Sequence, residues 1–223
     1  MLVYPLVIAL FLLARTTEFQ MRVGIFLTFL GMGVRLWANG YAGHLKVNKT
    51  EGSGQPKIGH LITAGPYGYV RNPLYFGSLL IGLGFCTIVG SWWLAFIAGG
   101  CLFWVYRSKI SEEEEVLRHE WTHEYERYQS MVPRWLPTWK RYPNGYGEWS
   151  WKGVVASKEL KTVVWVVILL IALYLREEIF QEHNFLSGKN YPLRIFLIGL
   201  LLFLLVFELI MEVRKHRLNL KKG

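Results

Sequence analysis

Apolar residues fall into six runs along this chain, separated by polar and charged segments. The runs cover residues 1–14, 23–42, 74–89, 92–106, 162–175 and 193–213. An upright membrane span needs about 20 mostly apolar residues, and interfacial Trp, Tyr and Lys extend a shorter run, so the pattern predicts an all-α, polytopic membrane helix bundle with about six transmembrane helices. The first run lacks a basic leading region and a small-residue cleavage site, so we expect a retained helix there.

The segments between the runs predict how the bundle is organised. Gly90 and Ser91 predict a turn between the third and fourth runs, and residues 107–132 predict a charged, cytoplasmic amphipathic helix. Helical spacing places on one face of that helix the side chains of Leu117, Trp121, Tyr125, Tyr128 and Val132. We divide the chain into a membrane core (1–137), a Trp-rich interfacial connector (138–161) and a C-terminal transmembrane helix pair (162–223).

Lys and Arg are distributed unevenly along the chain, and this predicts its orientation. They concentrate in residues 43–72, 107–161 and 214–223, whereas the short turns 15–22 and 176–194 carry few of them. By the positive-inside rule, both termini and both long loops are cytoplasmic, which makes the chain a multi-pass membrane protein.

The composition narrows the function classes. The chain is 52% hydrophobic and only 18% charged, which is too apolar for an ordinary soluble domain. Its formal charge of +9 fits basic residues that meet anionic lipid headgroups, and no stacking module or basic helix favours nucleic acid. Cys86 and Cys101 lie within apolar runs, so neither a disulfide framework nor a metal site is indicated.

Candidate chemistry begins where a Gly/Pro-rich loop runs into the third apolar run. Asn72 followed by Pro73 predicts a helix start, with Asn72 capping free backbone N–H groups. Such a helix start at the cytoplasmic surface binds carboxylates or phosphates, and Arg71 adds a charge-assisted fork. The alternative is that Arg71 only fixes the orientation of the helix in the membrane through its positive charge. For the glutamates at 112–115, the alternative to a functional role is a solvated helix start with Ser111 as its cap.

Two motifs in order carry a family resemblance. Residues 61–67 read LITAGPY and residues 71–77 read RNPLYFG, and a glutamate cluster follows the next helical hairpin. The cluster is followed by Leu117, Tyr125, Tyr128, a Val-Pro pair and Pro137. Over roughly residues 55–137 the chain resembles the isoprenylcysteine carboxyl methyltransferase and phospholipid methyltransferase superfamily. It departs from the pattern at Asn72, where His is usual, and at Thr122, where Gly is usual.

The resemblance implies a membrane-embedded methyltransferase whose cofactor is S-adenosylmethionine, bound from the cytosol, with no metal. Carried over by register, the cofactor contacts are Gly59, His60, Leu61, Ile62, Tyr67, Asn72, Pro73, Leu74 and Tyr75. Glu113 and Lys109, one helical turn apart, fall where the family has its acceptor-side acidic and basic pair. For an amine acceptor, Glu113 orients the amine or takes its proton, whereas a carboxylate acceptor is oriented by Arg71 or Lys109.

The acceptor and the class of activity keep alternatives at this stage. We favour a phospholipid amine as the acceptor over a prenylcysteine carboxylate. A sterol-type reductase with a nicotinamide cofactor and a non-catalytic lipid-binding relative are further candidates. Residues 119–123 read HEWTH, so a zinc endopeptidase acting through His119, Glu120 and His123 is another, although the helical wheel places both histidines on the solvated side.

Two further features have more than one interpretation. Arg35, inside the second apolar run beside Asn39, either snorkels to the interface or meets a lipid phosphate or an acidic partner. The glycines at 77, 82 and 84 predict close helix contact.

Overall fold

The computed structural model describes residues 16–42, 61–90, 92–143, 145–157, 159–181 and 191–220. Over these residues the chain forms seven α-helices, one 3-10 helix and no strand. They are α2 (Glu18–Ala42), η1 (Gly65–Gly68), α3 (Pro73–Val89), α4 (Trp92–Glu120), α5 (Thr122–Met131), α6 (Trp151–Ala156), α7 (Glu159–Gln181) and α8 (Tyr191–Leu220). Two compact units result: Thr17–Leu160, and a second unit that holds α8 and α7 from Lys161 onward. The all-α prediction is confirmed for the described residues.

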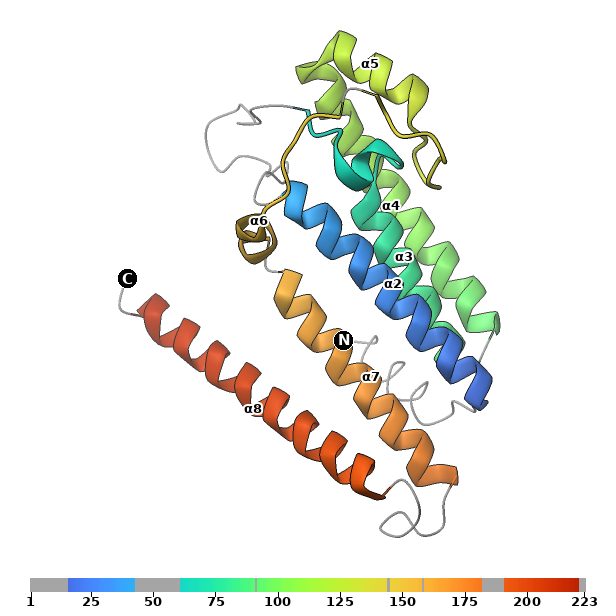
Figure 1. Cartoon of the computed structure of the whole chain (residues 1–223), viewed down its shortest axis with the longest axis vertical. Coiled ribbons are helices and arrows are strands. Elements are labelled where there is room, and N and C mark those ends of the chain that lie inside the picture. Colours follow the sequence, from blue (N-terminus) through green and yellow to red (C-terminus); the bar gives the residue numbers. More distant parts are fainter. Residues whose placement is uncertain are drawn as a thin grey trace. The chain divides into compact units, whose positions relative to one another are not determined.

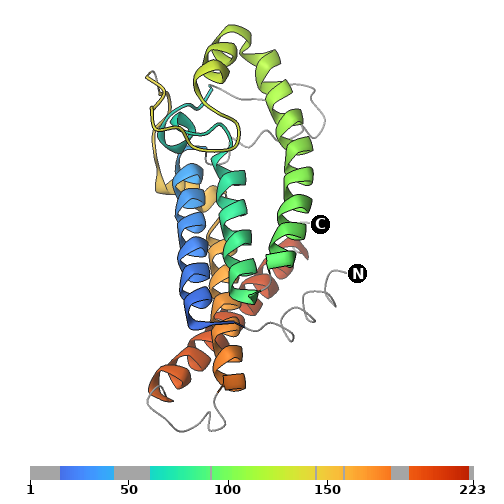
Figure 2. The ribbon, with the colours of Figure 1, turned by 90° about the vertical axis from the view of Figure 1, so that its right-hand side faces the viewer.

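Glycines bring α2 and α3 together along a seam in the first unit, where the two helices run side by side (Figures 1 and 2). A Cβ built on Gly31 would lie 2.6 Å from the Gly77 carbonyl oxygen, and one on Gly84 would lie 2.6 Å from the Gly24 carbonyl oxygen. Within each helix the two glycines are two turns apart, so they fall on one face and let the backbones touch. The predicted close contact is confirmed for Gly77 and Gly84, whereas Gly82 faces α4.

The turn between α3 and α4 is the predicted one, but α4 continues much further than the apolar run. Gly90 ends α3 in the left-handed conformation, with φ 73°, which glycine adopts without a Cβ clash. The prediction that a separate helix begins at residue 107 is wrong, because no Gly or Pro stands between residues 101 and 120 to end α4 there. Ser111 therefore lies inside α4 and caps nothing.

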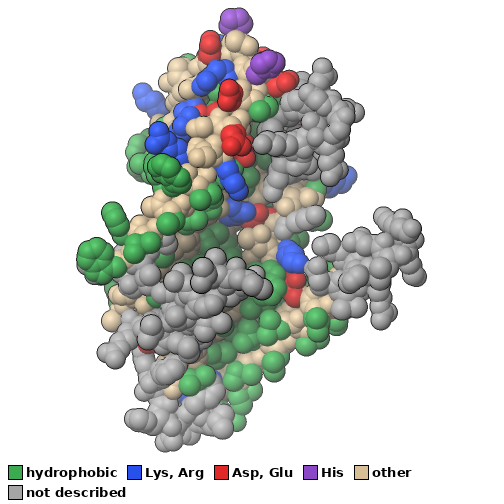
Figure 3. Space-filling view, turned by 180° about the vertical axis from the view of Figure 1, so that it is seen from behind, with side chains coloured by type: hydrophobic (Ala, Val, Ile, Leu, Met, Phe, Trp, Pro, Cys, Tyr) green, Lys and Arg blue, Asp and Glu red, His purple; other side chains and the backbone are tan. Residues whose placement is uncertain are grey.

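The side chains that α4 exposes change from apolar to charged along the helix. Its first half exposes large apolar side chains such as Phe96 and Trp104, whereas its second half is charged. Charged and histidine side chains gather at the end of this unit that carries α5 (Figure 3). The exposed apolar half of α4 is suited to lipid contact, and its charged half to water.

The aromatic stripe on α4 and α5 forms a core although the helix breaks within it. Trp121 has non-helical backbone angles and separates α4 from α5. Tyr125, Tyr128 and Val132 nevertheless pack in one buried cluster with Leu61 and Tyr142, and Leu117 and Trp121 lie against it. The predicted shared face is confirmed, and it holds residues 61–68 against α5.

The first part of the connector, residues 138–150, crosses the loop that precedes α3. Backbone N–H groups of the connector donate to carbonyls of that loop and of α2. The pairs are Thr138 with Tyr69, Tyr142 with Gly68, and Ser150 with Gly40, each 2.9 Å from N to O. The Tyr146 carbonyl in turn accepts from Thr63 and Ala64. These hydrogen bonds pair backbone N–H and C=O groups of the connector and the loop that would otherwise lack partners.

Membrane-spanning capacity is clear for two described helices by length and composition. These are α2 and the Tyr191–Met211 part of α8, which exposes most of its side chains, whereas α3 is a shorter apolar helix of 17 residues. Apolar side chains exposed along most of α8 fit a lipid environment. The count of six spans stays a prediction, and its first run, 1–14, lies outside the described residues.

Candidate functional site

The loop before α3 is shaped by η1 and by glycine. Gly65 has φ 59°, and a Cβ at this position would lie 2.2 Å from the Tyr41 ring, so only glycine fits here. The Tyr128 hydroxyl donates to the Tyr67 carbonyl at 2.7 Å. Helix α5 therefore fixes the loop that carries the Tyr67 side chain.

Helix α3 begins at Pro73, as predicted, but Asn72 does not cap it. The Asn72 amide nitrogen donates to Glu114 Oε1 and to the Arg134 carbonyl, each at 3.3 Å, and no side-chain cap bond forms. The predicted cap is wrong because these two acceptors turn the amide away from the helix start. The backbone N–H groups of Leu74 and Tyr75 in the first turn thus keep their donor capacity.

Glu114, and not Glu113, is the partner of Arg71. Arg71 Nη1 lies 3.3 Å from Glu114 Oε1, and Arg134 binds the same carboxylate with two nitrogens. The Glu114 side chain is only 3% exposed. A buried carboxylate between two guanidinium groups is satisfied electrostatically, and here it ties α4 to the loop and to the segment after α5.

Helical spacing in the sequence points to a buried position for Glu114, which the family motif does not distinguish from its neighbouring glutamates. Ile110, Glu114, Leu117 and Trp121 follow one another at spacings of four, three and four residues, which continues the apolar stripe of α4 toward its N-terminus. Ile110 is fully buried, like Glu114. A carboxylate on a buried stripe requires a cationic partner.

Glu113 turns instead toward the first turn of α3. The Tyr75 hydroxyl donates to Glu113 Oε1 at 2.8 Å, and the Tyr75 ring packs against Tyr106 with a centroid separation of 4.9 Å. Burial raises the pKa of the Tyr67 hydroxyl, and so does the Glu113 charge, whereas the Arg35 charge acts in the opposite direction. The charges of Glu113 and Arg35 therefore both act on Tyr67. The hydrogen-bonded pair of Tyr75 and Glu113, with the Tyr106 ring packed against Tyr75, forms one polar cluster.

The other residues predicted for the site have different environments. Leu61 is buried in the tyrosine cluster, Ile62 is half-buried, and Lys109 is exposed on α4. A Cβ at Gly147 of the connector would lie 3.3 Å from Ile62 Cγ2, so the connector covers this end of the loop. Gly59 and His60 lie outside the described residues.

The HEWTH segment does not form the helix that a zinc peptidase uses. Its two histidines lie on different helices, His119 on α4 and His123 on α5, with the break at Trp121 between them, and both are exposed. Over the described ranges no group of three or more His, Cys, Asp or Glu side chains is placed to hold a metal.

The cluster has the donor set that S-adenosylmethionine needs. Its carboxylate requires N–H donors, which the uncapped first turn of α3 supplies. Its ammonium and sulfonium groups are cations, for which the Glu113 carboxylate and the rings of Tyr75 and Tyr106 are complementary. The residues present therefore fit this cofactor.

A family model matches part of the chain. Residues 19–124 match the family model described as phospholipid methyltransferase, which confirms the resemblance to the wider superfamily for this segment. The segment contains α2, the loop, α3 and α4, and so holds every residue that the motifs assign to the site. No curated protein and no solved structure matches the chain.

Proposed function

We propose that this chain, whose residues 19–124 match the phospholipid methyltransferase family, is an integral membrane methyltransferase that uses S-adenosylmethionine to methylate a phospholipid amine. The match supports a membrane methyltransferase of the phospholipid or isoprenylcysteine type. The observation that carries the finer proposal is the Tyr75–Glu113 hydrogen bond, which joins the start of α3 to the glutamate segment of α4.

The acceptor chemistry follows from the charge at the cluster. S-adenosylmethionine, when bound, supplies a methyl group on a positively charged sulfur. The first turn of α3 and Glu113 would hold it, and it would supply this methyl group to the lone pair of an amine nitrogen, with S-adenosylhomocysteine as the leaving group. The amine must therefore arrive neutral, and the proton it gives up is accepted by the Glu113 carboxylate. Tyr75 orients this carboxylate by donating its hydroxyl hydrogen bond to Glu113 Oε1.

An amine fits this cluster better than a carboxylate does. A carboxylate acceptor would be repelled by Glu113 and would need a free cation to orient it. Arg71, the nearest guanidinium in sequence, is paired with Glu114 and its side chain is only 10% exposed. This pairing leaves Lys109, exposed on α4, as the cation for a carboxylate acceptor, so the preference for the phospholipid amine rests on the negative charge of Glu113.

We expect the cluster to lie at the membrane interface. Helix α2 is long enough to span, and the exposed side chains of α4 change from apolar to charged at residues 106 and 107, close to the cluster. With the orientation expected from the Lys and Arg distribution, this end of the unit faces the cytosol. A lipid headgroup then reaches Glu113 while its acyl chains stay in the hydrocarbon.

The test uses purified protein, radiolabelled S-adenosylmethionine and vesicles of phosphatidylethanolamine. We expect label in the lipid headgroup, and a loss of about 10²- to 10⁴-fold in kcat for Glu113→Gln, as for removal of a general base. Glu115→Gln is the matched control because Glu115 is exposed on the same helix, and it should keep wild-type activity.

Two results would contradict the proposal. Label that appears only in a base-labile ester of a prenylcysteine substrate would show a carboxylate acceptor. Full activity of Glu113→Gln would remove Glu113 from the chemistry. His119→Ala should be silent, since loss of activity there would favour the peptidase.

A further inference from the structure

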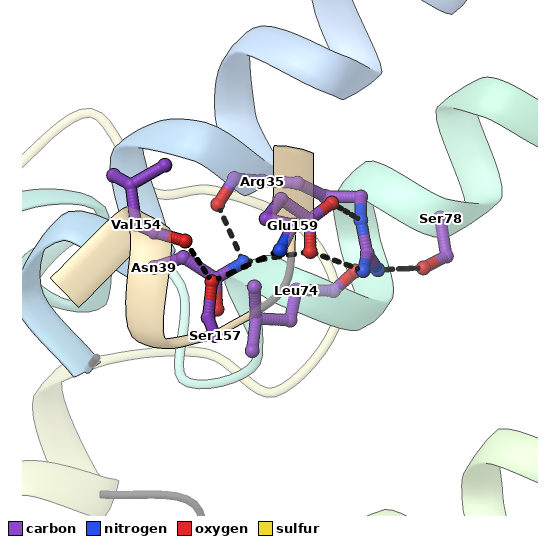
Figure 4. Close-up of polar contacts among 7 residues, drawn as sticks. All are labelled: Arg35, Asn39, Leu74, Ser78, Val154, Ser157 and Glu159. Carbon is purple, nitrogen blue, oxygen red and sulfur yellow. Dashed lines mark hydrogen bonds and ion pairs between the residues drawn. The ribbon is translucent and has the colours of Figure 1, made fainter. Parts of the chain in front are cut away.

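Arg35, on α2, has its side-chain partners inside the first unit, and they come from two other helices, α3 and α7 (Figure 4). Its Nε and Nη2 donate to the two carboxylate oxygens of Glu159, at 2.6 and 2.9 Å. Its Nη1 donates to the Leu74 carbonyl at 3.2 Å and to Ser78 Oγ at 2.5 Å. The guanidinium is thus directed at protein acceptors, which excludes snorkelling to the interface in this structure.

Glu159 is held in place as firmly as Arg35. It is the first residue of α7 and is 3% exposed, and its backbone N–H donates to Ser157 Oγ at 3.3 Å. The amide of Asn39, itself fully buried, donates to Glu159 Oε2 at 3.0 Å (Figure 4). Two-point contact with Arg35 and a third donor from Asn39 compensate the cost of burying this carboxylate.

The Arg35 contacts fall on the turn of α3 that the proposed function uses. Leu74 and Ser78 lie one turn apart at the start of α3, and Tyr75, the hydrogen-bond donor to Glu113, is in the same turn. Gly77 allows this approach, because a Cβ there would lie 2.6 Å from Arg35 Cγ. The carbonyl of Leu74 is therefore fixed from the side of α2, while the Tyr75 hydroxyl is fixed from the side of α4.

We propose that Arg35 and Glu159 are positioning residues for methyl transfer: Glu159 orients the Arg35 guanidinium, and Arg35 holds the first turn of α3 so that Tyr75 meets Glu113. The inference rests on the proposed function for its kinetic effect. It also assigns a role to a residue beyond the matched family segment, since Glu159 follows residue 124.

The experiment compares two substitutions that remove the same kind of ion pair. Glu159→Gln breaks the pair with Arg35, and Glu178→Gln is the control, because Glu178 binds a buried arginine, Arg194, at 2.6 Å in the other unit. Both should lower the Tm of the purified protein. Only Glu159→Gln should lower kcat, by about 10- to 100-fold, since small displacements of positioned groups cost that much.

A second readout keeps the inference independent of activity. Hydrogen exchange of a peptide covering residues 73–80, measured without cofactor, should be faster in Glu159→Gln than in the wild type and unchanged in Glu178→Gln. If Glu159→Gln does not fold, Ser78→Ala, which removes one Arg35 acceptor and leaves the ion pair intact, should show the faster exchange and a smaller loss of kcat.

The outcomes separate the two proposals. The proposed function is contradicted if wild-type protein neither transfers methyl groups nor gains Tm from S-adenosylhomocysteine. The exchange data would still show in that case whether Glu159 fixes the first turn of α3. Unchanged exchange in residues 73–80, or losses of kcat in Glu159→Gln and Glu178→Gln that scale equally with Tm, would overturn the positioning role.

Discussion

The glycine seam between α2 and α3 makes a quantitative prediction from two neighbouring glycines of one helix. A Cβ at Gly31 would lie 2.6 Å from the Gly77 carbonyl oxygen and 2.9 Å from atoms of Ile81, well below the 3.4 Å at which ordinary contact begins. A Cβ at Gly33 meets no atom within 4 Å. Gly31→Ala must therefore push the helices apart, whereas Gly33→Ala needs no movement.

The two substitutions should affect the free energy of unfolding differently. Overpacking costs about 1–3 kcal/mol, and rigid backbone on both sides of the seam favours the upper part of that range for Gly31→Ala. Gly33→Ala should be neutral or stabilise α2 by up to about 1 kcal/mol, because alanine is the better helix former. At about 2–4 °C per kcal/mol for a chain of this size, the two Tm values should differ by several degrees.

The assay is thermal unfolding of both variants in the same detergent, with wild-type protein alongside. Separation of the helices also moves Gly77 relative to Arg35, so Gly31→Ala should lose methyl transfer as well as stability. Equal Tm values for Gly31→Ala and Gly33→Ala would refute the packing argument, since the two changes are chemically identical and differ only in what the new methyl group meets.

Two other predictions concern groups around the loop. Glu114→Ala leaves Arg71 and Arg134 without their carboxylate, so it should lower the free energy of unfolding by about 3–5 kcal/mol, measured with denaturant. Glu115→Ala should change it by less than about 0.5 kcal/mol, and similar values for the two variants would contradict the buried ion pairs of Glu114. Burial also raises the pKa of Tyr128. The folded state therefore keeps a proton that the unfolded chain loses above about pH 10. The free energy of unfolding should fall as the pH rises past that point. Tyr128→Phe should make this fall shallower, and an unchanged slope would show that the Tyr128 phenol does not contribute.

Features that depend on local sequence were predictable. The start of α3 at Pro73 follows from the fixed φ of proline, and the end at Gly90 follows from the left-handed conformation that glycine tolerates. The shared face of Tyr125, Tyr128 and Val132 follows from helical spacing alone. These features depend on residues within a few positions of one another, so a single chain segment carries the information.

The continuation of α4 and the uncapped Asn72 were not predicted. A charged segment after an apolar run looks like a new helix, yet nothing in residues 107–120 stops the old one. Asn72 has the right side chain for a cap, but acceptors brought by α4 and by the segment after α5 compete successfully for its amide. Local preference loses here to partners that are 42 and 62 residues away in sequence.

The sequence by itself determined that Glu113 and Glu114 belong to one glutamate cluster and that Arg35 is a charge inside an apolar run. Only the tertiary structure decided their partners. Adjacent residues of a helix point about 100° apart, so Glu113 meets Tyr75 of α3 while Glu114 meets Arg71 and Arg134. Arg35 finds its carboxylate 124 residues away, at Glu159. Such pairings depend on which helices pack together, and no local pattern of residues specifies that.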